Sequence, residues 1–342
     1  MDKTLRTVRE TRAERVVLKH KLKYSGLFLP LLIALILPLY LTDYWIYALT
    51  LTFYYVIMAV TWNLLGGYTG QFSLSHHTFA MIGSYISALL IIKTGIPLWM
   101  GMASSWIFNA FISVLLGILC LRMRGIYLAL TTWAFAEIVK TYIRMDFEFT
   151  GGDRGLNAPL FFKTMNPIPY YYLFLAFAVL TIIVIAIIMR SRIGYYLRTI
   201  RNDEVAAQAM GVNTVRWKVF AFMVASVFAS VAGTLYGHFT GLISPVSGDF
   251  YEMSLIIIFV VIGGMRSQAG PVVGAISVRF LAEVLKKWPE IRMIILALVV
   301  ILIMRFFNGG VMEFLRQGVQ RIRQRKGRTP VSGLQKMEPR QR

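Results

Sequence analysis

The sequence has little charge and almost no cysteine for its length. Of its 342 residues 15% are charged, against about 25% in an ordinary soluble domain, and 57% are hydrophobic. This composition excludes a disordered chain and argues against a soluble enzyme. The one cysteine, Cys120, cannot form a disulfide within the chain.

Catalytic and nucleotide-binding motifs are also missing. The dipeptide Gly-Lys does not occur, so the chain has no phosphate-binding loop of the Gly-x-x-x-x-Gly-Lys-Ser/Thr type. His-Glu-x-x-His and Gly-x-Ser-x-Gly are absent as well. We therefore expect no catalytic residue, no metal and no cofactor in this chain. The alternative is a membrane-embedded enzyme that uses His76 or Glu137, which lie on different predicted helices.

Long apolar runs dominate what is present. A helix needs about 20 apolar residues to cross a bilayer, and some of the runs are interrupted by glycine and polar residues. The sequence thus predicts an all-α, polytopic membrane protein with about ten transmembrane helices, some of which are half-helices or re-entrant segments. The runs are 25–41, 45–66, 72–92, 98–121, 126–143, 168–189, 219–243, 250–264, 268–288 and 291–307.

The positive charges are distributed unevenly between these runs. With ten spans and a cytoplasmic N-terminus, 27 of the 36 Lys and Arg residues fall on the cytoplasmic side and 7 on the other. Attraction to anionic membrane lipid then explains the net charge of +20 without nucleic acid. We expect a basic cytoplasmic arm (1–24) without a cleaved signal peptide, a membrane domain (25–310) and a basic cytoplasmic tail (311–342).

One cytoplasmic loop, 190–218, carries the sequence chemistry of a short helix. Asn202 or Asp203 can cap its N-terminus, and Glu204 lies in the first turn, where the helix dipole favours an acid. Ala206 and Ala207 are strong helix formers with little bulk. Gly211 lies where such a helix stops. From these residues alone, a plain connecting helix and a docking helix are both open.

The stretch Glu204-Val-Ala-Ala-Gln-Ala-Met-Gly211-Val-Asn213 resembles the EAA loop of ATP-binding-cassette (ABC) importer permeases. It is most similar to the branched-chain amino-acid permeases, in which Glu stands one residue further from Ala-Ala than in the general pattern. Four other stretches resemble the same family in the same order, over about 45–310. They are Gly67–His76, Thr132–Ile138, Thr150–Leu156 and Ile262–Ala275.

The resemblance implies a type II-like ABC importer permease in a bacterial or archaeal inner membrane, with both termini in the cytoplasm. In that family the loop forms a coupling helix, which implies ATPase contact through Asn202, Asp203, Glu204, Ala206, Ala207 and Gly211. The implied partners are two ATPase subunits that bind ATP and Mg²⁺, a second, different permease and an external substrate-binding protein. The implied cargo is leucine, isoleucine, valine or a related small amino acid or amide, with urea as the alternative.

Two pairs of opposite charges lie inside predicted spans. Glu137 and Lys140 are three residues apart and Arg279 and Glu283 four, which are pairing distances on a helix. An acid at membrane depth faces the bundle interior or a partner. Glu137 therefore either holds its span in register or lines a substrate path. We expect the Arg279 pair to be structural.

The densest polar cluster near a span follows a group of glycines. Gly66, Gly67 and Gly70 predict an unwound entry to the next helix, and broken helices can present backbone dipoles to a zwitterionic substrate. The alternative is close helix packing through small residues. The candidate translocation path comprises Gly70, Gln71, Ser73, Ser75, His76 and Glu137.

Two further segments have simpler expectations. The glycine-rich junction Gly263–Gly274 predicts helix packing and helix breaking. The longest external loop, about 144–167, contains three acids and is either a landing surface for a soluble binding protein or a solvated loop.

Overall fold

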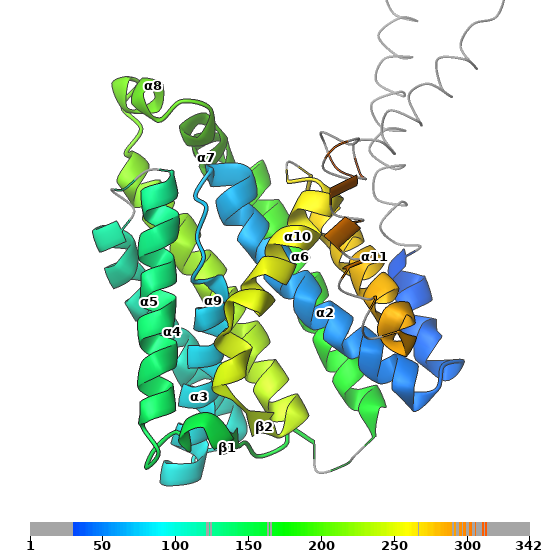
Figure 1. The fold of residues 1–342 in the computed structure, drawn as a ribbon. Helices are drawn as coiled ribbons and strands as arrows, with labels where there is room; N and C mark the ends of the chain where they lie inside the picture. Colours follow the sequence, from blue (N-terminus) through cyan, green and yellow to red (C-terminus); the bar gives the residue numbers. More distant parts are fainter. Residues whose placement is uncertain are drawn as a thin grey trace, which may run out of the picture.

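The computed structural model describes residues 30–288, except 121, 122, 124, 163, 165 and 266, together with isolated positions between 291 and 312. The described chain is almost entirely helical, as predicted (Figure 1). The arm 1–24 lies outside the described residues, as do all but one residue of the tail 311–342 and about half of the run 291–307. The proposed domain boundaries therefore stay predictions.

A helix lies in each of the predicted runs from 25–41 to 268–288. The first contains the apolar helix Pro30–Leu39, whose last turn is η1 (Leu37–Leu39). The long helices are α2 (Asp43–Asn63), α3 (His76–Thr94), α4 (Leu98–Cys120), α5 (Ile126–Met145), α6 (Pro167–Arg190), α9 (Thr214–Thr240), α10 (Phe250–Gly263) and α11 (Gly270–Val284).

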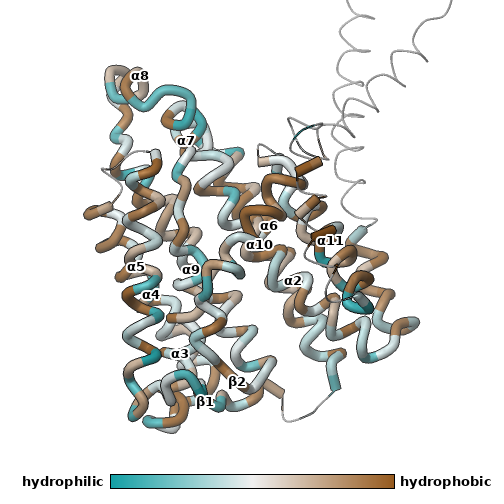
Figure 2. The backbone as a smooth tube through the Cα atoms, viewed as in Figure 1, coloured by the Kyte–Doolittle hydropathy of each residue, from teal (hydrophilic) through white to brown (hydrophobic). Residues whose placement is uncertain are grey.

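Five helices of the described chain are long and apolar enough to cross a membrane. They are α2 with its continuation to Thr69, α3, α4, α6 and α9. Charge at Glu137, Lys140 and Arg144 lowers the hydropathy of α5, and α10 has only 14 residues. The fold is thus that of a polytopic membrane protein. Figure 2 shows hydrophobic residues along the long helices and a hydrophilic loop at one end of the bundle.

The centre of the bundle is the packing of α9 against α2, α3 and α4. Small residues allow the backbones of α3 and α9 to approach closely. A Cβ atom on Gly233 would collide with the carbonyl oxygen of Ala80, and one on Gly83 would collide with Ser230. Phe79 and Phe222 fill the space beside this contact, with ring centroids 5.6 Å apart.

The loop between α6 and α9 forms two helices rather than one. α7 (Arg192–Asn202) precedes the expected short helix, α8 (Glu204–Ala209), and both lie at one end of the bundle (Figure 1). The sequence analysis missed α7, although Gly194, Leu197 and Ile200 repeat every three residues and are buried. α9 also begins at Thr214, five residues before the predicted run.

The opposite end of the bundle is tied together by a small antiparallel sheet that the sequence analysis did not predict. β1 (Leu156–Asn157) pairs with β2 (Leu242–Ile243), so that the loop after α5 joins the end of α9. His238 fastens the same loop, because its Nδ1 lies 2.7 Å from the carbonyl oxygen of Pro159 and its Nε2 lies 2.8 Å from Ser87 Oγ. Both ring nitrogens thus have structural partners. Besides η1, the described chain has the short 3-10 helices η3 (Gly152–Arg154), η4 (Pro245–Gly248) and η5 (Leu285–Lys287).

Candidate functional site

The helix of the second span is broken where the sequence predicted an unwound entry. α2 widens into a π-helix, η2 (Leu64–Thr69), and ends at Gly70, whose φ of 73° is in the left-handed region that glycine tolerates. Residues 71–75 are irregular and α3 begins at His76. A Cβ atom on Gly67 would collide with the carbonyl oxygen of Met265, so the π-helix lies directly against the α10–α11 junction.

Three of the predicted path residues lie together in this segment. Ser73 Oγ is 3.1 Å from Ser75 Oγ, and His76 Nε2 is 3.0 Å from Thr61 Oγ1, one turn before the break. The indole of Trp62 donates to the carbonyl oxygen of Ser73 at 2.9 Å and holds the irregular chain against α2. The segment is therefore a fixed structure with its own hydrogen bonds.

Several buried polar atoms here have no partner among the described residues. Gln71 is 2% exposed, yet both polar atoms of its amide lack a hydrogen bond, as does Nδ1 of His76. A buried polar group without a partner costs about 1–3 kcal/mol. Such groups are expected where water or a ligand passes, so the broken helix has the polar capacity that a translocation path needs.

Gly70 is placed differently from the other path candidates. It is exposed, and a Cβ atom there would lie 3.4 Å from Cγ of Arg201 on α7. The guanidinium of Arg198, also on α7, lies 5.9 Å from the ring centroid of Tyr68 in η2. The end of the π-helix thus contacts the loop that carries α8, a juxtaposition that the sequence analysis did not predict.

Glu137 lies on α5 in a group of charges drawn from three parts of the chain. Lys140 Nζ lies 2.7 Å from Glu137 and 3.3 Å from Asp249, which precedes α10. Arg144 lies 3.8 Å from Asp249 and 3.1 Å from Asp153. α5 also contacts the broken segment, because the backbone N–H of Leu74 donates to Thr132 Oγ1 at 3.0 Å. The expected pair of Glu137 and Lys140 is formed, and Asp249 extends it.

α8 presents most of its small residues outward. Asp203 caps it by accepting hydrogen bonds from the N–H groups of Val205 and Ala206 at 2.9 and 3.0 Å, whereas Asn202 is the last residue of α7. Ala206 is exposed, but Ala207 is fully buried. Gly211 ends the turn with a φ of 81° and nothing within 4 Å.

Glu204 is directed toward the bundle. One of its carboxylate oxygens lies 2.6 Å from Nζ of Lys218, on the second turn of α9. The residues predicted to contact the ATPase therefore do not all lie on the exposed surface. Ala206 is on the exposed surface of α8, while Glu204 and Ala207 attach α8 to the protein.

A second group of buried charges was only partly anticipated. The expected pair of Arg279 and Glu283 is long, at 3.9 Å, and Glu283 is held more closely by Lys286 Nζ at 2.6 Å. Tyr55 OH donates to Glu252 at 2.8 Å, and the guanidinium of Arg279 lies 5.0 Å from the Tyr55 ring centroid. The described residues contain no group of three or more His, Cys, Asp or Glu side chains arranged to hold a metal ion.

The chain matches known transport proteins over most of its length. The family model described as "Branched-chain amino acid transport system / permease component" matches residues 44–304. LivM, a high-affinity branched-chain amino acid transport system permease protein, is 30% identical over 295 residues in both Salmonella typhimurium and Escherichia coli. In each case the match covers 78% of this chain and 69% of LivM.

More distant permeases also match. LivH of Salmonella typhimurium is also named a high-affinity branched-chain amino acid transport system permease protein. It is 26% identical to this chain, and the match covers 65% of this chain and 78% of LivH. The ribose import permease RbsC of Haemophilus influenzae is 29% identical over 35% of this chain and 37% of its own. No solved structure matches the chain significantly. The family match and the LivM relatives together show that this chain belongs to the family of permease components of branched-chain amino acid transport systems.

Proposed function

We propose that this chain is the permease subunit of an ATP-driven importer that carries branched-chain amino acids across the inner membrane. The LivM and LivH relatives support leucine, isoleucine and valine as cargo. The assembly contains two ATPase subunits, which bind ATP and Mg²⁺, a second and different permease, and an external binding protein. The chain crosses the membrane about ten times, with both termini and the loop 190–218 in the cytoplasm.

The observation that carries this proposal is the placement of α8. It projects from one end of the bundle with Ala206 exposed, and it follows α7, which contacts the π-helix at Tyr68 and Gly70 (Figure 1). ATP-driven closure of the two ATPases pushes on α8. This rigid-body push switches the permease pair between outward-open and inward-open states. The broken helix then alternates its access to the two sides.

The experiment is a comparison of Ala206→Arg with Ala206→Ser. Because Ala206 is exposed, neither substitution disturbs the core, and both variants are expected to reach the membrane in wild-type amounts. Arginine adds bulk and charge to the surface where an ATPase docks, so the ATPases no longer co-purify and leucine uptake is lost. Serine keeps the surface small and retains both. Wild-type uptake with Ala206→Arg contradicts the coupling role of α8.

Partners and cargo are tested separately. A tagged chain purified from its native membrane in mild detergent is expected to bring two ATPase chains and a second permease with it. Uptake of labelled leucine by the reconstituted assembly is expected to be inhibited by isoleucine and valine but not by urea. Inhibition by urea alone, or recovery of the chain without ATPases when a control importer stays intact, contradicts the corresponding part of the proposal.

A further inference from the structure

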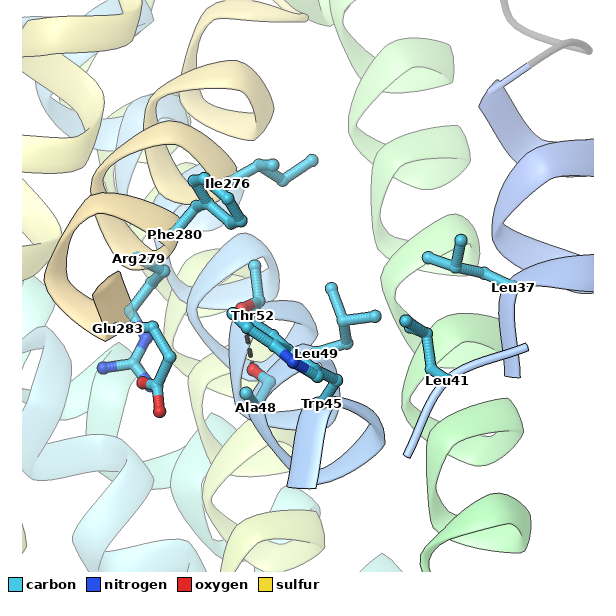
Figure 3. A pocket seen from close by; sticks show the side chains of 10 residues that line it. All are labelled: Leu37, Leu41, Trp45, Ala48, Leu49, Thr52, Ile276, Arg279, Phe280 and Glu283. Atoms are coloured by element: carbon cyan, nitrogen blue, oxygen red, sulfur yellow. Dashed lines mark hydrogen bonds and ion pairs between the residues drawn. The ribbon is translucent and has the colours of Figure 1, made fainter. Parts of the chain in front are cut away.

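A cavity of about 350 Å³ lies apart from the broken helix and from α8. It is bounded by Leu37 and Leu41 near the first helix, by α2 around Trp45 and Leu49, and by α11 (Figure 3). The lining comes from the first half of α2 and the second half of α11. The cavity is therefore toward the end of the bundle opposite α8, which is the external end in the proposed topology (Figure 1).

The walls of the cavity are apolar. Leucine side chains form one side, and Trp45 stacks on Phe280 at a centroid distance of 6.1 Å on the other. The hydroxyl of Thr52 donates to the carbonyl oxygen of Ala48 at 2.8 Å, so it needs no partner inside the cavity. An apolar cavity of about 150 Å³ already holds a molecule of the size of benzene. This cavity thus has room for a small molecule with a branched aliphatic group.

The charged residues among those that line the cavity are one cation and one carboxylate, Arg279 and Glu283 (Figure 3). Their side chains are only 12% and 4% exposed. The charges just outside the lining also include both signs, because Lys286 lies beside Glu283, and Glu252 and Arg279 both contact Tyr55. A site with balanced charges at one end and apolar walls elsewhere favours an occupant that carries both charges and no net charge.

The two charged residues of the lining keep bonding capacity for such an occupant. Nη2 of Arg279 lies 3.9 Å from Oε2 of Glu283, which is too long for a hydrogen bond. Lys286 and Tyr44 both donate to the other carboxylate oxygen of Glu283, Oε1. Nε of Arg279 is buried and has no hydrogen-bond partner among the described residues. An acceptor for an ammonium and a donor for a carboxylate therefore lie next to each other.

We propose that this cavity is a binding site for a zwitterionic α-amino acid with an apolar side chain. The side chain lies between Leu37 and Phe280, the ammonium lies at Oε2 of Glu283, and the carboxylate lies at the guanidinium of Arg279. Only one carbon atom separates the two charged groups of an α-amino acid, so they reach a neighbouring carboxylate and cation together. A lipid acyl chain fits the same walls but offers nothing to either charge.

The inference rests on the proposed function for the identity of the ligand, which is leucine, isoleucine or valine. It adds a station for the cargo in the external half of the chain, separate from the broken helix at Gln71. Cargo that arrives from the external binding protein occupies this station before it reaches the broken helix.

The first experiment measures binding of labelled leucine to the purified assembly, without ATP and without the external binding protein, which itself binds leucine. The competitors are 4-methylpentanoate, which lacks only the ammonium of leucine, and 3-methylbutylamine, which lacks only the carboxylate. Unlabelled leucine is expected to displace the label at least about tenfold better than either analogue, because each analogue loses one charge-assisted contact. Equal displacement by leucine and both analogues overturns the proposal.

The variant Glu283→Gln tests the ammonium contact. Glutamine keeps the shape of the side chain but removes its charge, so leucine binding is expected to weaken at least about tenfold. Binding of 4-methylpentanoate is expected not to weaken, because this acid has no ammonium. A purely structural role of Glu283 predicts an equal loss for both ligands, and that result overturns the assignment.

A pair of tryptophan variants tests the cavity itself. Ile276 lines it and is 44% exposed, so Ile276→Trp fills the space without disturbing buried packing. The matched control is Ser277→Trp, because Ser277 is exposed on the same helix and is not part of the lining. Ile276→Trp is expected to lose leucine binding and keep its thermal unfolding midpoint, whereas Ser277→Trp binds as wild type.

The outcomes separate this inference from the proposed function. Equal leucine binding by Ile276→Trp and Ser277→Trp overturns the site, as expected if the cavity holds a lipid acyl chain instead. Undiminished leucine uptake by Ile276→Trp likewise rejects the station but leaves the importer role standing. A wild-type assembly that does not take up leucine contradicts the proposed function itself.

Discussion

The ammonium of Lys218 lies 2.6 Å from a carboxylate oxygen of Glu204, although 14 residues separate the two along the chain. Their side chains are 7% and 17% exposed, so the pair is largely removed from solvent. It fastens the first residue of α8 to α9, and the buried Ala207 fixes the middle of α8. α8 is therefore joined by an ion pair to α9, the helix at the centre of the bundle.

Breaking this pair is expected to destabilise the loop. Lys218→Met removes the ammonium that lies closest to a poorly solvated carboxylate, at a cost of about 2 kcal/mol, below the roughly 3–5 kcal/mol of a fully buried pair. The thermal unfolding midpoint and ATP-driven leucine uptake of the reconstituted assembly are both expected to fall. The charge swap Glu204→Lys/Lys218→Glu restores the pair and is expected to recover most of both. If the charge swap lowers the unfolding midpoint and leucine uptake as much as Lys218→Met does, the ion pair is not the cause of the loss.

The crossing of α10 and α11 is expected to tolerate no side chain at Gly274. A Cβ atom there would collide with the carbonyl oxygen of Phe259, so Gly274→Leu forces the two backbones apart and costs at least about 3 kcal/mol. Membrane yield and the unfolding midpoint are expected to drop sharply. Ser277→Leu is the matched control, because Ser277 is exposed on the same helix and the same side chain is added. Equal yields for both variants contradict the close packing.

These findings show which parts of the fold the sequence could predict. The apolar runs predicted the positions of the long helices because membrane spans are long and local in sequence. The glycines at 66, 67 and 70 predicted the broken helix, and Gly263–Gly274 predicted the helix crossing, because glycine records the close approach of backbones. Asp203 and Gly211 predicted the ends of α8 for the same local reasons.

The parts that were missed depend on contacts between distant residues. The pairing of Lys140 with Asp249, of Tyr55 with Glu252 and of β1 with β2 each joins positions about 85 or more residues apart. Nothing local in the sequence specifies such partners. α7 is a different case. Its buried residues have helical spacing, but the arginines between them give it the composition of a solvated loop.

Gln71 offers a direct test of the path through the broken helix. Its amide is buried and makes no hydrogen bond to any residue that the structure describes, so Gln71→Leu removes an unfavourable group and is expected to keep or raise the unfolding midpoint. If the amide contacts cargo, uptake falls about tenfold, which corresponds to the loss of one hydrogen bond of about 1.4 kcal/mol. We expect this combination of retained stability and reduced uptake. A stable variant with normal uptake contradicts a path role for Gln71.

Substitution of Glu137 distinguishes a structural role from a role in the translocation path in the same way. Its side chain is 36% exposed, and Lys140 keeps Asp249 at 3.3 Å when Glu137 is neutralised. Glu137→Gln is therefore expected to cost less than about 1 kcal/mol of stability, as for other partly exposed ion pairs. Because a neutral amide no longer offers a charge to a zwitterionic amino acid, leucine uptake is expected to fall.

The control for Glu137 is Lys140→Met. This change leaves Glu137 and Asp249 without their shared cation, so it is expected to lower the unfolding midpoint more than Glu137→Gln does. Thermal unfolding of the purified assembly and uptake per assembled transporter measure the two effects separately. A loss of yield with Glu137→Gln, at normal uptake per transporter, assigns Glu137 to holding α5 in register. Normal yield together with normal uptake contradicts both roles, because neither the helix nor the cargo then needs the carboxylate.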